Sequence, residues 1–182
     1  MKRRWAALAL VGAGIPGLLS LLPVLPAVEG VPTWMLLVNP GLLLVVFAGL
    51  GALAAPQVGF TSRIALRASG VKLGILPANA LMLLAAGAAA GLAVALADHA
   101  TRGLWQHAAA TPPSLAEAWA PASLLLGIFY GGIVEEITMR WGVMSLAVLA
   151  IWSIIARAQD RPPRAAIAAG ILVAALIFAA GH

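Results

Sequence analysis

The sequence contains no cysteine, and only 9% of its 182 residues are charged. The lack of cysteine excludes disulfides, thiol catalysis and cysteine-ligated metal sites. A soluble domain carries about a quarter charged residues, so the scarcity of charge excludes a water-soluble globule, a disordered tail and a nucleic-acid module. Apolar residues are abundant instead: 63% of the chain is hydrophobic, and the mean hydropathy is +1.02. This composition is typical of an integral membrane protein.

Uncharged apolar stretches long enough to cross a bilayer recur along the chain. A hydrocarbon core of about 30 Å requires roughly 20 apolar residues in a helix. We therefore expect one all-α membrane domain, residues 1–182, forming a polytopic transmembrane helix bundle of which five or six spans are present. The expected spans are 5–28, 34–60, 73–97, 122–140, 141–156 and 165–182, and the expected loop is 98–121.

The basic residues indicate an orientation. The net charge of +5 comes from eleven Lys and Arg residues, most of which lie at the ends of apolar runs. Such charges favour the cytoplasmic side. We expect a multi-pass protein of the cell membrane with a cytoplasmic N-terminus and no nucleic-acid partner. The first span contains Pro16, Pro23 and Pro26, which predict a kinked helix.

Two acids and one base interrupt the apolar tract 122–156. A charged side chain near the centre of a membrane helix costs about 2.5 to 3.5 kcal/mol on insertion scales, so Glu135, Glu136 and Arg140 require compensation. Glu136 and Arg140 are four residues apart, which favours an ion pair. In an α-helix Glu135 points about 100° away from Glu136 and lacks such a local partner. Adjacent carboxylates in a low dielectric resist ionising together, so one of them can act as a base near neutral pH.

Phe178 and His182 end the last apolar run four residues apart, on one face of the expected helix. A lone histidine at a helix end is more often structural than catalytic. Combined with the two glutamates and Arg140, however, His182 can hold and polarise a water, as hydrolysis within a bilayer requires. The structural alternative is that Glu136 and Arg140 only support packing, while Glu135 reaches an interface.

These two motifs together resemble a known family. Residues 135–140 have the pattern EExxxR and residues 178–182 the pattern FxxxH, in the order found in the CPBP intramembrane endopeptidases. That family includes the CAAX-type prenyl proteases and bacteriocin-processing proteins. The resemblance covers residues 120–182, whereas the earlier spans match by hydropathy only. It implies a membrane core of about eight helices and peptide cleavage by a glutamate-activated water. A helix satisfies its own backbone hydrogen bonds, as a segment surrounded by lipid requires.

The resemblance also implies roles for the motif residues. Glu135 would be the catalytic base, Glu136 and Arg140 its supporting pair, and His182 would orient the water, with Phe178 shaping the pocket. The implied partners are a lipid bilayer and a membrane-associated peptide or protein substrate. Use of a metal such as zinc stays open, because the sequence has no HExxH motif. The family's later motif, a histidine followed four residues on by Asn or Asp, is missing before His182, so we expect a C-terminally incomplete chain.

Residues 141–156 allow two interpretations. If 122–156 is one helix, nearly all basic residues lie inside, but Glu135 and His182 differ in depth by about 18 Å at 1.5 Å per residue. If the chain breaks near Trp141 and Gly142 and crosses back, the two groups lie at similar depth. We favour the broken tract, because catalysis requires the groups to be within hydrogen-bond reach.

Other functions are compatible with this pattern. A non-enzymatic polytopic membrane protein, such as a transporter subunit or an immunity scaffold, would use the Glu/Arg pair structurally, and an inactive family member would keep the motifs without activity. A transporter usually shows repeats or matching broken helices in two halves, and none is evident. Asp98, His99 and His107 in the loop resemble metal ligands, but we do not expect a metal site there.

Overall fold

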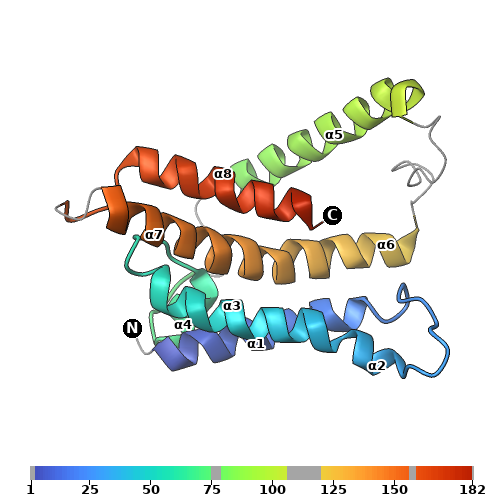
Figure 1. Ribbon diagram of the computed structural model, residues 1–182, viewed down its shortest axis with the longest axis horizontal. Helices are drawn as coiled ribbons and strands as arrows, with labels where there is room; N and C mark the ends of the chain where they lie inside the picture. The colour runs from blue at the N-terminus through green and yellow to red at the C-terminus, as the bar shows by residue number, and fades with distance from the viewer. Residues whose placement is uncertain (1–2, 75–78, 106–119, 156–158, 182) are drawn as a thin grey trace. The chain divides into compact units, whose positions relative to one another are not determined.

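The computed structural model describes residues 3–74, 79–105, 120–155 and 159–181, and within these ranges every regular element is helical (Figure 1). The all-α prediction is therefore confirmed for the described part of the chain. The residues form two compact units. The larger one comprises Met1–Lys72 and Leu125–His182, and the smaller one comprises Leu73–Leu124.

The larger unit contains most of the helices. They are α1 (Arg3–Ser20), α2 (Thr33–Leu36), α3 (Val38–Ala54), α4 (Arg63–Ala68), the π-helix η1 (Gly127–Met144), α7 (Ser145–Ile155) and α8 (Arg164–Ala180). The smaller unit contains α5 (Ala80–Trp105), and α6 (Pro121–Leu126) leads from it directly into η1.

Three helical segments are long and apolar enough to cross a membrane: Thr33–Ala54, Ala80–Leu104 and Pro121–Ile155. They match three of the expected apolar regions, which supports a membrane protein. Helix α8 is apolar but shorter, with 17 residues. The first expected span is not helical throughout, because α1 ends at Ser20, before Pro23 and Pro26 remove backbone donors.

The expected loop 98–121 is partly helical. Helix α5 continues through Asp98 and His99 as far as Trp105. No proline interrupts this stretch, and the Thr101 hydroxyl donates to the Ala97 carbonyl at 2.8 Å, a bond compatible with the helix. The loop prediction was therefore wrong for residues 98–105. His107 lies outside the described residues.

The break predicted near Trp141 and Gly142 is absent, because Pro121–Ile155 is one continuous helical segment of 35 residues. Between Pro121 and Pro162 the sequence contains no proline to end it. A glycine alone does not terminate a helix that is held by packing, and Gly142 is buried against Phe47 of α3. The hydroxyl of Ser145 donates to the Arg140 carbonyl five residues earlier, at 3.4 Å, which fits the π-helical register.

The core of the larger unit lies where α1, α3 and η1 meet. Its buried residues are Ala6, Leu10, Leu44, Ala48, Ala52, Ala55, Ala65, Val134, Ile137 and Trp141. Glycines allow the close approach of helices: a side chain at Gly17 would meet the Phe129 carbonyl of η1, and one at Gly51 would meet Trp141. Helix α8 packs on α7 and η1 in the same way, through Gly170 against Val148.

The direction of these helices places their connections at two ends of the larger unit. Helix α1 runs antiparallel to η1, whereas α3 runs parallel to it (Figure 1). The start of α1, helix α4, the end of α7 and the start of α8 consequently lie at one end, and the segment 21–32 lies at the other. The elements at the first end carry exposed basic residues: Arg3 and Arg4 at the start of α1, Arg63 and Arg67 on α4, and Arg164 at the start of α8.

Candidate functional site

The ion pair expected on the long helix is present. Glu136 Oε1 lies 2.8 Å from Arg140 Nη1, and the side chains are 47% and 69% exposed, respectively. The pair therefore lies outside the packed core, with Glu136 and Arg140 on the lining of two cavities. This position leaves its charged atoms accessible to a ligand or to water.

The smaller cavity lies between η1 and α8 and has a volume of about 300 Å³. From η1 it is lined by Gly131, Glu135, Glu136, Met139, Arg140 and Met144, and from α8 by Ile171, Ala174, Ala175 and Phe178. Four of the five predicted site residues thus meet at one cavity, although the two motifs are far apart in the sequence. The fifth, His182, lies outside the described residues.

The π-helical register explains why both glutamates reach this cavity. In an α-helix side chains three or four residues apart share a face, but i→i+5 hydrogen bonds lengthen that spacing to between four and five residues. The residues that η1 contributes follow this longer repeat, from Gly131 through Glu135 and Glu136 to Arg140 and Met144. Adjacent residues still point in different directions in this register, and of the two glutamates only Glu136 also lines the larger cavity described below.

The depth conflict expected for a single helix does not arise for the residues that the structure describes. Helices α7 and α8 pack against each other and are joined by a short connection. The distance of each motif along its helix can therefore be counted from that connection. At 1.5 Å per residue Glu135 lies about 30 Å before Ile155, and Phe178 lies about 21 Å after Arg164. The π-helical stretch fits more residues into each turn, which shortens the first distance. The continuous helix therefore brings the motifs together without a break.

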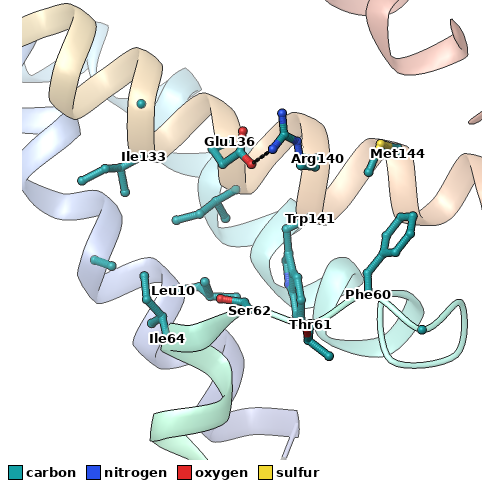
Figure 2. Close-up of a pocket in the computed structure, with 14 residues that line it drawn as sticks. Leu10, Phe60, Thr61, Ser62, Ile64, Ile133, Glu136, Arg140, Trp141 and Met144 are labelled. Atoms are coloured by element: carbon teal, nitrogen blue, oxygen red, sulfur yellow. Dashed lines mark ion pairs between the residues drawn. The ribbon is translucent and has the colours of Figure 1, made fainter. Parts of the chain in front are cut away.

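A larger cavity, of about 640 Å³, lies on the other side of the ion pair. Figure 2 shows Glu136 and Arg140 at its edge on η1, with Trp141 pointing from η1 toward Thr61 and with Phe60 beside it. Glu136, Arg140 and Met144 line both cavities. Sequence reasoning missed this second cavity, because its walls come from α1, from the segment after α3 and from η1.

Two polar side chains near the site, those of Thr138 and Trp141, have their polar atoms directed at other parts of the fold. The Thr138 hydroxyl donates to the carbonyls of Val134 and Glu135, at 3.0 and 3.1 Å, so it is not directed at either cavity. The indole nitrogen of Trp141 is buried and has no hydrogen-bond partner among the described residues. A Cβ added at Gly51 would lie 2.7 Å from it, so the N–H edge of the ring faces α3.

The described residues do not form a metal site. Nowhere in this part of the chain do three or more His, Asp or Glu side chains gather in a way that could hold an ion. A catalytic zinc takes three protein ligands, whereas the smaller cavity offers two carboxylates. His182, the other predicted site residue with a metal-binding side chain, lies outside the described residues. Asp98 and His99 on α5 belong to no such group.

We expect the substitution Glu136→Gln to have little effect on stability. Both charged groups lie on the lining of the cavities rather than in the packed core, so the loss of this pair should change the melting temperature little. The neutral amide would no longer hold Arg140 at the edge of both cavities. Thermal unfolding in detergent, compared with Glu29→Gln in the exposed segment 21–32, measures the effect. A loss of several kcal/mol would contradict the accessible position of the pair.

Comparisons with known proteins do not assign the chain to a family. No protein-family model, no curated protein and no solved structure matches it. The function must therefore be argued from the cavity that brings Glu135, Glu136, Arg140 and Phe178 together.

Proposed function

We propose that this chain is an integral membrane endopeptidase that hydrolyses a peptide bond with a water activated by Glu135. The observation that carries the proposal is the meeting of Glu135, Glu136, Arg140 and Phe178 at one cavity between η1 and α8. An intramembrane ionisable residue usually serves a function, and here two carboxylates and a guanidinium lie together. The resemblance to the CPBP endopeptidases requires the same two motifs to form one site.

The reaction divides among these side chains. The Glu135 carboxylate accepts a proton from water while the oxygen attacks the carbonyl carbon of the peptide. The carbon–nitrogen bond then breaks, and the proton passes to the departing amine, which leaves a carboxylate and an amine as products. The ion pair of Glu136 and Arg140 positions this machinery, and the Phe178 ring closes the cavity on the side of α8.

A non-enzymatic role is the second candidate. The ion pair of Glu136 and Arg140 forms within a single helix, so it exists without any substrate or partner. In a scaffold or a transporter subunit this pair would only neutralise charge within the membrane. The two proposals differ in whether a peptide bond is broken.

Hydrolysis in heavy-oxygen water separates the two candidates. The chain is reconstituted in liposomes with a mixture of synthetic apolar peptides, and the products are analysed by mass spectrometry. An endopeptidase yields paired fragments and places one heavy oxygen in the new carboxylate. The Glu29→Gln variant, altered outside the cavity, should cleave like the wild type. Intact peptides after prolonged incubation would favour the scaffold.

We also expect a single crossing by the segment Pro121–Ile155 and a cytoplasmic basic end. The chain has no native cysteine, so single cysteines report cleanly on an impermeant thiol reagent. Gln159→Cys, between α7 and α8, and Val71→Cys, shortly after α4, should be protected in intact cells, whereas Val31→Cys, between α1 and α2, should be labelled. Labelling of Gln159→Cys together with Val31→Cys would contradict the single crossing.

A further inference from the structure

The larger cavity is suited to an apolar ligand next to the ion pair. Most of its wall is made of apolar side chains, including Leu10, Phe60, Ile133, Ile137 and Trp141. Its volume, about 640 Å³, falls within the range of about 300 to 1,000 Å³ that is typical of ligand pockets. That space exceeds the needs of a single side chain. The occupant should therefore contribute several apolar groups.

One wall of the cavity is an extended piece of backbone. A turn ends at Gly59, whose φ of 80° is a conformation that favours glycine, and residues 60–62 follow without helical structure. Ser62 is extended, with φ −116° and ψ 133°, and its side chain and carbonyl cap α4. The Thr61 backbone makes no hydrogen bond to the rest of the described chain. Thr61 is exposed and lines the cavity, so its N–H and carbonyl lie beside the cavity without a bond to the described chain.

We propose that the larger cavity binds the apolar residues that flank the scissile bond of a peptide substrate, in an extended conformation beside Thr61. This inference rests on the proposed function and names its substrate class. Extended peptides bind to exposed backbone edges through main-chain hydrogen bonds, while pockets take their side chains. Glu136 and Arg140 line both cavities, so a peptide seated here lies beside the ion pair that also borders the smaller cavity.

The unpaired backbone favours a peptide over a lipid chain. A hydrocarbon chain fills apolar space but satisfies neither the N–H nor the carbonyl of Thr61. A peptide does both, because its own backbone carries a donor and an acceptor at each residue. Thr61 and Ser62 are also polar residues of this wall.

Photocrosslinking locates the peptide without requiring cleavage. An apolar synthetic peptide that carries one benzophenone side chain is irradiated with the wild-type chain and with Glu135→Gln in liposomes. We expect adducts on residues 59–64 and on α1 near Leu10 and Ala13 in both proteins. Adducts restricted to other surfaces would overturn the proposal. Crosslinking of the same residues by a benzophenone-labelled phospholipid that the peptide does not displace would also overturn it.

Filling the cavity provides a second measurement. Ala13→Trp places a large ring in the cavity and should raise the KM for an apolar peptide about tenfold, the effect of losing one well-buried side chain. Gly12→Trp is the matched control, because a side chain at Gly12 meets nothing within 4 Å. An equal KM in both variants would overturn the proposal. Adducts in the cavity without any cleavage would refute the endopeptidase but leave the peptide site standing.

Discussion

Replacing Glu135 by Gln is expected to reduce peptide hydrolysis by about 10² to 10⁴-fold, the contribution of a positioned general base. The amide has nearly the shape of the carboxylate but cannot accept the proton of the attacking water. Glu135 lies on the lining of the smaller cavity rather than in the core, so expression and membrane insertion should not change. Initial rates at saturating peptide, normalised to purified protein, measure the effect.

Glu29→Gln is the matched control for this substitution. It makes the same chemical change at an exposed carboxylate in the segment 21–32, outside both cavities. The control should hydrolyse peptide at the wild-type rate. If Glu135→Gln also retains a near-wild-type rate, Glu135 is not the base, and the division of roles among the motif residues is wrong.

Gly51→Ala is expected to lower the free energy of unfolding by about 1 to 3 kcal/mol, as overpacking of a close contact does. A Cβ at this position of α3 would lie 2.6 Å from the Trp141 carbonyl oxygen, and it would also meet the indole ring. A backbone oxygen cannot move aside as a flexible side chain can. The helix η1 must shift away from α3, so the geometry of both cavities and the hydrolysis rate should suffer as well.

Gly49→Ala on the same helix separates packing from helix propensity. A Cβ at Gly49 meets nothing within 4 Å, so this change should leave the melting temperature unchanged or raise it slightly. Thermal unfolding of both variants in the same detergent measures the difference. Equal melting temperatures would show that α3 and η1 are not in the close contact described above.

Whether the long helix is an α-helix or a π-helix decided how much of the site could be derived from the sequence. Hydropathy located apolar helices, and the spacing of Glu136 and Arg140 predicted their ion pair, because four residues span about one turn in either kind of helix. The position of Glu135 could not be derived in this way. No feature of residues 127–144 predicts a π-helix, whose longer repeat lets Glu135 and Glu136 line the smaller cavity together.

The expected difference in depth between Glu135 and His182 came from assuming a fixed bilayer thickness. Placing residue 122 at one surface assumed that the helix fits a core of about 30 Å, whereas a segment of 35 residues is about 52 Å long at 1.5 Å per residue. Counted from the turn before α8, the two motifs approach each other. The end of α1 and the helical residues 98–105 were misplaced for a simpler reason, since charge and hydropathy mark spans more reliably than helix ends.

A thiol crosslink between η1 and α8 tests most directly whether the two motifs share one cavity. Met139 and Ala175 line the smaller cavity from the two helices, and neither has a role in the proposed reaction. The double variant Met139→Cys, Ala175→Cys, in a chain without native cysteine, should be joined rapidly by a short bifunctional thiol reagent in membranes. The control Met139→Cys, Leu172→Cys uses an exposed residue of α8 outside the cavity and should react slowly. Equal or reversed rates would contradict the shared site.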